Sequence, residues 1–456
     1  MSVLFLGCNV TATDNRRAMP DWFNAMGTIN GVNLPHLEPY SRFRHFVEDP
    51  SFSHNVGAMG WNTFRLPVEW DDYAAAGGER NLTAVREGIE GRRALVASLR
   101  QARRAAGAGD PVLLILDFHQ YKFGAVCGGV GMPRGIIDES GLSRDDGNCV
   151  FQAFERFWHN PAAQRKWFAW ARAFVEALPD ILKEESDWLK VGIEPINEPQ
   201  FGFAEPVFTN QMVTTIWNLY RFTRSGAIQQ QIDGKLIPFY RGFLEAMADV
   251  PRFDEVMENG VMVFEPFVLD HLNISVDVGP VSLEVNTDGH YQGMLALNAV
   301  HWLAAPHHYV GALDEGFLSL MPQFARDQLS RYPNMFVDGA RIRERFRWIQ
   351  GRMAEAGMET MIGEWGTQTG LLDARGHAGG HRAWIADSKA AMGAHSRGGL
   401  WWQYVQDRTA GERSFYLLRS RDGAGAEIPW REQVLKCSGR FNLARLVFGR
   451  CPEERR

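Results

Sequence analysis

The sequence predicts one large α/β domain built as a (β/α)₈ barrel. Short apolar or β-branched runs alternate with longer stretches of helical periodicity, which indicates βα units. Eight candidate strands can be placed: Val3–Cys8, Asn62–Pro67, Pro111–Leu116, Val191–Ile196, Gly260–Pro266, Val300–Pro306, Glu359–Glu364 and Gly399–Tyr404. Neither GxGxxG after a strand nor GxxxxGK[ST] occurs, so nucleotide-binding α/β folds lack their phosphate loop. A barrel therefore fits better than an open sheet.

Helices are expected between these strands, because the intervening segments are rich in Ala, Leu, Arg and Glu. The expected helices are Gly88–Ala106, Ala162–Leu178, Leu236–Ala248, Ala340–Ala356 and His381–Met392. Two connections are unusually long, Tyr121–Pro161 after the third strand and Pro199–Lys235 after the fourth. Loops of this length are usually functional or carry small elements of their own. We expect residues 1–410 to form the barrel and 411–456 to be an extension that packs on it.

Composition excludes several partner classes. Hydrophobic residues make up 45% and charged residues 22%, which is ordinary for a globular protein with a sizeable core. With a net charge of -6 and no dense Lys/Arg run, neither nucleic acid nor an anionic membrane is an expected partner. No stretch reaches the roughly 20 apolar residues of a membrane span. The 15 Trp residues suit either sugar rings or a large aromatic core.

The N-terminus and the cysteines favour a cytoplasmic location. The apolar run in MSVLFLGCNV is too short for a signal peptide and is interpreted as a strand. The five cysteines, Cys8, Cys127, Cys149, Cys437 and Cys451, are an odd number without CxxC spacing. They indicate neither a zinc site nor a disulfide framework, so free thiols are expected at Cys127 and Cys149. No cofactor or metal is expected.

Polar residues follow the strands at the ends where a barrel holds its chemistry. The strand ends read FRLPVEW, LDFHQ, IEPINEP, APHHY, IGEWG and WWQY. In barrels of this kind catalytic groups lie at the carboxyl ends of the strands. Buried carboxylates, imidazoles and a guanidinium are costly unless they are paired or used. Their coincidence at one rim predicts a site.

Two glutamates in these motifs suit glycoside hydrolysis. That reaction requires two carboxyl groups that flank the scissile bond, one protonated and one ionised. Glu198 in INEP and Glu364 in GEWG satisfy this requirement. Alone, Glu198 could instead be a helix N-cap or a surface acid.

As a set, these motifs resemble glycoside hydrolase family 5 of the retaining clan A, from Val3 to about Asp407. The residues that carry the resemblance are Arg65, His119, Asn197, Glu198, His307, Tyr309, Glu364 and Trp402. The resemblance implies that Glu198 is the general acid/base and Glu364 the nucleophile. Because these two family glutamates fall on strands four and seven, we expect their carboxyl groups to face each other at about 5 Å, the spacing of retaining enzymes. It also implies that Arg65 and Tyr309 keep Glu364 ionised.

The same resemblance gives the remaining residues substrate-binding roles. Asn197 would bind the 2-hydroxyl of the sugar, His119 and His307 would line the cleaved subsite, and Trp402 would form its floor. His119 could instead be a core histidine whose hydrogen bonds are satisfied. Other side chains nearby are expected to be structural: Glu69, Asp117, Glu194, Glu265, His308 and Trp401.

Within family 5 the sequence is most similar to the endoglycoceramidase and glucosylceramidase-like branch. The similarity rests on LILDFHQ, FERFWHNPAAQRKW, VMVFEPF, LIPFYRGFLEAM and APHHY. Tyr121 stands where that branch usually has an Asp, and the C-terminal β-sandwich of many members is missing. The loop Gln200–Lys235 carries many large apolar residues: Phe201, Phe203, Phe208, Met212, Trp217, Tyr220 and Phe222. They indicate either a hydrophobic aglycone, as in a glycolipid, or a small helical insert packed on the barrel.

Three other interpretations differ in substrate, in catalytic residues or in the absence of catalysis. An endo-β-glucanase or β-mannanase would use the same two glutamates on a polysaccharide. A metal-dependent barrel hydrolase could use His119, His307 and His308, but such barrels need an HxH pair at the end of strand one, where this sequence has GCN. A non-catalytic carbohydrate-binding barrel is a third class. The expected substrate is thus a carbohydrate or glycolipid, and the oligomeric state is open.

Overall fold

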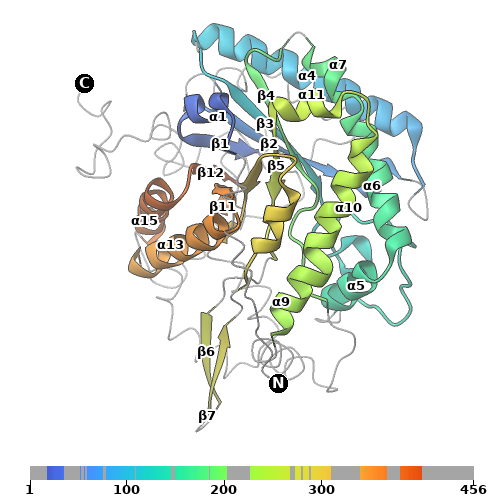
Figure 1. Cartoon of the computed structure of the whole chain (residues 1–456), viewed down its shortest axis with the longest axis vertical. Helices are drawn as coiled ribbons and strands as arrows, with labels where there is room; N and C mark the ends of the chain where they lie inside the picture. Colours follow the sequence, from blue (N-terminus) through green and yellow to red (C-terminus); the bar gives the residue numbers. More distant parts are fainter. Residues whose placement is uncertain are drawn as a thin grey trace, which may run out of the picture.

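The computed structural model describes residues 18–34, 52, 56, 59–74, 79–107, 109–144, 149–183, 185–202, 226–267, 273–278, 281–286, 289–309, 339–366 and 380–402. Parallel strands form the centre and helices surround them (Figure 1). The predicted fold class, an α/β barrel, is confirmed.

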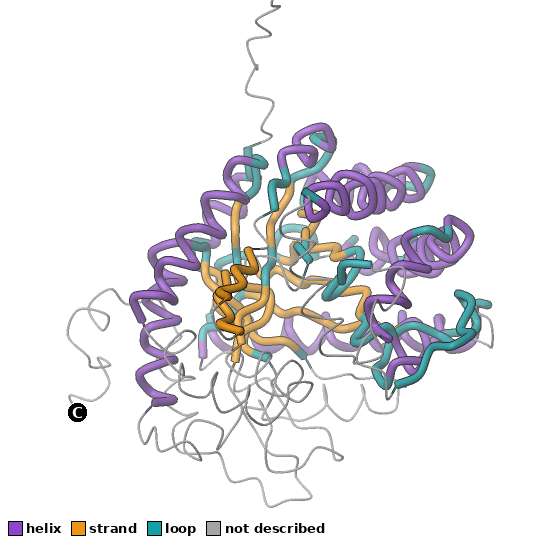
Figure 2. The backbone as a smooth tube through the Cα atoms, turned by 90° about the horizontal axis from the view of Figure 1, so that it is seen from below, coloured by secondary structure: helices purple, strands orange, loops and turns teal. Residues whose placement is uncertain are grey.

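Ten short parallel strands make up the central sheet. They are β1 (Ile29–Asn33), β2 (Thr63–Glu69), β3 (Val112–His119), β4 (Leu189–Glu194), β5 (Gly260–Phe264), β8 (Trp302–Ala304), β9 (His307–Tyr309), β10 (Glu359–Thr360), β11 (Ile362–Gly366) and β12 (Gly398–Trp401). Their order is β10-β8-β5-β4-β3-β2-β1-β12-β11-β9. Two residues separate β8 from β9, and Met361 alone separates β10 from β11. The two ends of the order are thus halves of the same two strands, and the sheet closes into a barrel with eight strand positions (Figure 2).

The first strand position corrects one prediction. β1 occupies the place between β12 and β2, with Ile29 opposite Gly398 and Gly31 opposite Thr63. The strand predicted at Val3–Cys8 is therefore not the first barrel strand, and those residues lie outside the described ones. The sequence INGVN has too much Gly and Asn to indicate a strand. Gly31 is needed there, because a Cβ atom would lie 1.7 Å from the carbonyl oxygen of Thr63.

Helices pack around the barrel and include all five that the sequence predicts. They are α1 (Asp21–Met26), α4 (Leu82–Ala106), α5 (Cys149–Trp158), α6 (Pro161–Val175), α7 (Leu178–Leu182), α9 (Ala227–Gln231), α10 (Ile237–Ala248), α11 (Phe253–Glu258), α13 (Gly339–Glu355) and α15 (Gly380–His395). Short turns of helix are η1 (Trp70–Tyr73), η3 (Gly124–Cys127), η4 (Ile232–Leu236) and η5 (Gln292–Leu297). An antiparallel hairpin of β6 (Asn273–Val278) and β7 (Val281–Asn286) projects away from the barrel (Figure 1). No described helix is long and apolar enough to cross a membrane.

Side-chain alternation along the strands separates a core from a polar rim. An apolar cluster joins α1 to residues of several strands: Phe23, Met26, Ile29, Leu113, Ile115, Val261, Val263, Leu303, Ala305, Met361 and Leu400. Because successive side chains alternate between the two faces, the residue two positions further along each strand faces the same way. Those next residues are Asp117, Glu265, His307 and Trp402. The alternation that fills the barrel therefore also delivers polar groups to its carboxyl end.

The connection after β3 corrects a second prediction. It carries η3 and α5, and Cys127 forms a disulfide with Cys149, with 5.6 Å between their Cα atoms. The prediction of free thiols is wrong, because the loop folds back on α5, where Phe123 packs 5.2 Å from Phe154. Disulfides persist mainly in oxidising compartments. The cytoplasmic location stays a prediction.

The connection after β4 is described only at its ends. Phe201 is fully buried and packs 4.3 Å from Phe267, so this aromatic residue belongs to the core. The other apolar residues of this loop named above lie outside the described part, as does the extension 411–456. The domain boundary at residue 410 therefore stays a prediction.

Candidate active site

A single buried guanidinium lies at the centre of the polar rim. Arg65, on β2, has no exposed surface. Its Nε atom lies 2.6 Å from Glu194, and its Nη1 atom lies 2.5 Å from Glu364. Further oxygen atoms close to it are those of Asn33 (3.0 Å), Asn197 (2.7 Å), Asp117 (3.1 Å) and Glu265 (3.9 Å). Arg65 therefore links five strand positions and supplies positive charge to four carboxyl groups.

Glu364 reaches this centre from β11. The register between β11 and β12 shifts between Ile362 and Trp365, and such an irregularity re-aims side chains. Both carboxyl oxygens of Glu364 accept hydrogen bonds, Oε1 from Arg65 and Oε2 from the Tyr309 hydroxyl, each at 2.5 Å. Two charge-assisted donors favour negative charge on this carboxylate.

Glu198 follows β4 in a strained backbone conformation. Its φ is 44°, a left-handed value that side-chain-bearing residues rarely adopt. Its N–H donates to Glu265 Oε2 at 2.9 Å, and its carbonyl accepts from Gln120 Nε2 at 2.9 Å. Burial raises the pKa of the Glu198 carboxyl to about 7, although the charges of Arg65 and Lys122 act in the opposite direction. A carboxyl of this kind is suited to donate a proton near neutral pH.

The two glutamates lie beside one another across an imidazole. Nδ1 of His307 lies 3.0 Å from Glu198 Oε1 and 3.3 Å from Glu364 Oε2. One carboxyl oxygen of Glu198 and one of Glu364 lie within 4.8 Å of each other. Burial lowers the pKa of His307 to about 4 despite the nearby carboxylate of Glu364. The imidazole is therefore neutral at neutral pH.

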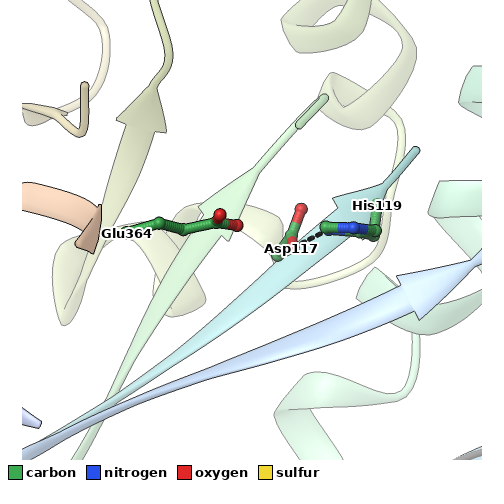
Figure 3. A group of neighbouring side chains, drawn as sticks. All are labelled: Asp117, His119 and Glu364. Atoms are coloured by element: carbon green, nitrogen blue, oxygen red, sulfur yellow. Dashed lines mark hydrogen bonds and ion pairs between the residues drawn. The ribbon is translucent and has the colours of Figure 1, made fainter. Parts of the chain in front are cut away.

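His119 and Trp402 form the next part of the rim. His119 Nδ1 lies 2.7 Å from Asp117 Oδ2, and the His119 ring stacks on Trp402 with 5.7 Å between ring centroids. Figure 3 shows Glu364 directed toward Asp117 and His119 from the facing side of the barrel. The Asp117 carboxylate fixes the orientation of the His119 imidazole. This contact is compatible both with a core histidine and with a substrate-binding one.

Asn197 is buried between protein partners. Its Oδ1 atom accepts from Arg65, and its Nδ2 atom donates to the carbonyl of Gln120 at 2.8 Å. A side-chain amide has two N–H groups. One donor thus remains for a ligand when only the described residues are counted.

The structural roles predicted for two neighbours are confirmed. The His308 ring stacks on Trp384, 5.1 Å away, and its Nε2 contacts Ser388 Oγ at 3.1 Å, so it packs toward α15. Trp401 packs edge-on against Trp365 at 4.7 Å. Neither side chain joins the cluster around Arg65.

Sequence motifs missed how closely the other polar residues surround Arg65. Asn33 was missed because β1 was misplaced, and Asp117, Glu194 and Glu265 were interpreted as separate structural acids. Alternation with the inward core residues Ile115 and Val263 would have placed two of these acids inside.

Groups of acids and histidines here are close enough to hold a metal ion, among them Asp117 with His119 and Glu364. The Arg65 guanidinium already contacts Asp117 and Glu364, together with Glu194. The end of the first strand reads Val-Asn-Leu, which is not the HxH pair of metal-dependent barrels. The donor set therefore fits a guanidinium centre better than a metal centre.

Comparisons with known proteins show similarity of fold. No family model matches the sequence, and no curated protein matches it. Endo-glycoceramidase II from Rhodococcus sp., in a cellobiose-like imidazole complex, superimposes with a TM-score of 0.53 at 15% identity over 90% of this chain and 78% of that one. A GH5-4 broad specificity endoglucanase from an uncultured bacterium gives 0.51 at 13% identity over 93% and 97%. The chain thus has the barrel fold of family 5 glycoside hydrolases.

Proposed function

We propose that the protein is a retaining β-glycoside hydrolase with Glu198 as general acid/base and Glu364 as nucleophile. The observation that carries this proposal is that one carboxyl oxygen of Glu198 and one of Glu364 lie within 4.8 Å of each other, with the two side chains in unlike environments. Retaining enzymes place the two carboxyls about 5–5.5 Å apart, whereas inverting enzymes need about 6.5–9.5 Å for a water molecule.

The reaction has two steps. In the first, a Glu364 oxygen attacks the anomeric carbon, the glycosidic C–O bond breaks, and the Glu198 proton passes to the leaving oxygen. In the second, Glu198 takes a proton from water, the water oxygen bonds to the anomeric carbon, and Glu364 leaves. Before the first step and after the second, Arg65 pairs with the Glu364 carboxylate and the Tyr309 hydroxyl donates a hydrogen bond to it.

Three further residues are proposed to bind the sugar. The Trp402 ring, stacked on His119, offers an aromatic face to the pyranose. Asn197, through its remaining N–H, would donate to the 2-hydroxyl. His307 touches both glutamates and would line the cleaved bond.

A protein of the same fold supports covalent catalysis. Endo-glycoceramidase II from Rhodococcus sp. has also been captured as a lactosyl-enzyme intermediate, and that structure superimposes with a TM-score of 0.50 at 14% identity. The proposed intermediate here is the corresponding glycosyl ester on Glu364.

Variants of the two glutamates test the mechanism on aryl β-glycosides. Glu364→Ala should have no measurable activity, because no glycosyl-enzyme can form. Glu198→Ala should keep activity on activated leaving groups and regain more with azide. Equal loss in both variants without azide rescue would contradict the assignment. Chelator-sensitive activity would favour a metal mechanism, and no activity in the wild type would favour a carbohydrate-binding barrel.

For the substrate, we propose a β-glycoside with a hydrophobic aglycone. The apolar loop after Glu198 and the similarity to an endo-glycoceramidase support this choice, whereas the similarity to an endoglucanase supports the polysaccharide alternative. A long-chain alkyl or ceramide β-glucoside should be turned over faster than a soluble oligosaccharide, because remote binding energy can lower the barrier. Trp217→Ala should reduce that preference. An oligosaccharide preferred by wild type and variant alike favours the endo-β-glucanase or β-mannanase alternative.

A further inference from the structure

Glu265 is a buried acid that the proposed mechanism does not use. It directly follows β5 and is 1% exposed. Its own backbone is held by Tyr240, whose hydroxyl accepts from the Glu265 N–H at 2.9 Å. Tyr240 is itself fully buried. The backbone that carries the Glu265 side chain is thus held in place by a buried residue.

The two oxygens of this carboxyl contact two parts of the proposed active site. Oε2 accepts from the N–H of Glu198 at 2.9 Å, at the residue with left-handed φ. Oε1 lies 3.2 Å from Nε2 of His307. The other ring nitrogen, Nδ1, contacts Glu198 Oε1 at 3.0 Å. The Glu265 carboxyl therefore contacts Glu198 in two ways. It binds the Glu198 backbone N–H directly, and it reaches the Glu198 side chain through the His307 imidazole.

Charge balance indicates where a proton resides. Arg65 lies 2.5 Å from Glu364, 2.6 Å from Glu194 and 3.1 Å from Asp117, but 3.9 Å from Glu265. Four buried carboxylates beside one guanidinium are costly, and the one farthest from the cation gains least from ionising. Burial, and next the charge of Glu194, raise the pKa of Glu265 well above its usual range.

Ionisable groups face Glu265 from every side of the site. They are Arg65 on β2, Glu194 on β4, Glu198 after β4, Tyr240 on α10, His307 on β9 and Glu364 on β11. Only Arg65 among them is a fixed cation. The surrounding charge therefore favours a neutral Glu265.

Each ring nitrogen of His307 lies beside a carboxyl oxygen. Nε2 lies 3.2 Å from Glu265 Oε1, and Nδ1 lies 3.0 Å from Glu198 Oε1. A neutral imidazole has one N–H, so a hydrogen on Nδ1 leaves Nε2 as an acceptor for the Glu265 O–H.

We propose that Glu265 is a positioning residue that carries a proton and donates a hydrogen bond to Nε2 of His307, which makes the imidazole an Nδ1–H donor toward Glu198. This role rests on the proposed function. The Nδ1–H group stabilises the Glu198 carboxylate that forms when its proton passes to the leaving group. The acid/base then exchanges its proton without moving.

The tautomer of His307 tests this proposal without any activity measurement. In ¹⁵N-histidine NMR spectra, with the His307 signals assigned from a His307→Asn variant, the wild type should show the neutral Nδ1–H form. Glu265→Gln should keep that form, because its amide can donate to Nε2 and accept from Glu198. Glu265→Ala should lose it. An Nε2–H form in the wild type would overturn the proposal.

Kinetics provide the second readout on the best aryl β-glycoside. Glu265→Gln should keep kcat and the basic limb of the kcat/KM profile, since replacing a neutral carboxyl leaves the charge unchanged. Glu265→Ala should lower kcat about tenfold or more, part of the 10²–10⁴ that a positioned general acid contributes, with little change in KM. A Glu265→Gln basic limb displaced by about one pH unit would mean that Glu265 is ionised, and would refute the proposal.

Glu185→Gln is the matched control. Glu185 is a buried acid, 3% exposed, that pairs with Arg100 and Trp188 away from the rim. It should leave kcat and the pH profile unchanged even if it lowers the melting temperature. A wild type without glycosidase activity would refute the proposed function alone, because the tautomer measurement still decides the role of Glu265.

Discussion

Two glutamates at the same rim acquire opposite properties from their surroundings. Glu364 receives hydrogen bonds from Arg65 and Tyr309, which favour a carboxylate. Glu198 contacts the neutral imidazole of His307, and burial raises the pKa of the Glu198 carboxyl to about 7. Placing unlike environments around like side chains is how one site can provide both an acid and a nucleophile.

The raised pKa of Glu198 also predicts a pH-dependent cost in stability. Below the ordinary pKa of 4.5 the carboxyl is protonated in both folded and unfolded chains, so it costs nothing. As pH rises from 4.5 to about 7, the unfolded chain releases this proton more readily and the folded state loses up to about 3 kcal/mol. Glu198→Gln removes the cost. Its gain in the free energy of unfolding should be small at pH 4.5 and largest at pH 8, as measured by urea denaturation.

A surface variant gives the baseline for that measurement. Glu90 is half exposed, and Glu90→Gln reports what the same chemical change does outside the site. A Glu198→Gln gain that is the same at both pH values would show that the carboxyl has an ordinary pKa.

Sequence motifs identified the candidate residues better than their connections. Arg65, His119 and Glu364 stood out because each belongs to a recognisable motif within or at the end of a strand, and the structure brings them into one cluster. The hydrogen bond from the Glu198 N–H to Glu265 could not be predicted, because it depends on a left-handed residue and on contact between non-adjacent sequence segments.

Among the strands, residue propensity did not identify β1, which forms because its backbone packs closely against the neighbouring strand. Ile29–Asn33 has few strong strand formers, but Gly31 lets β1 approach Thr63 of β2. The strongly apolar strand β3 was predicted to within a few residues, because every one of its positions is buried. Similarly, the long helix α4 was recognisable from its periodicity, although its first turn was missed.

The placement of β1 makes a stability prediction. Gly31→Ala should lower the free energy of unfolding by about 3 kcal/mol or more, because the added Cβ would overlap the Thr63 carbonyl and force the strands apart. Gly351→Ala in α13 is the control, since no atom lies within 4 Å of its added Cβ and helix propensity favours Ala. A Gly31→Ala protein as stable as the wild type would contradict the assignment of Ile29–Asn33 as the first barrel strand.

Over the whole molecule, alternating strands and helices determine where chemistry can occur. Closure of the barrel brings strand ends from distant parts of the sequence to one rim, as in the pairing of Glu364 with His307. Alternation indicated the barrel from the sequence, whereas the disulfide between Cys127 and Cys149 depends on how one long loop folds back. The two features differ because one repeats along the chain and the other occurs once.

The stereochemistry of the reaction tests whether Glu198 and Glu364 form a retaining pair. The anomeric configuration of the first product released from an aryl β-glycoside can be followed by ¹H NMR before mutarotation. We expect the β-anomer, because two successive displacements, at Glu364 and then by water, restore the starting configuration. Initial release of the α-anomer would show a single displacement and would contradict the assignment of Glu364 as the nucleophile.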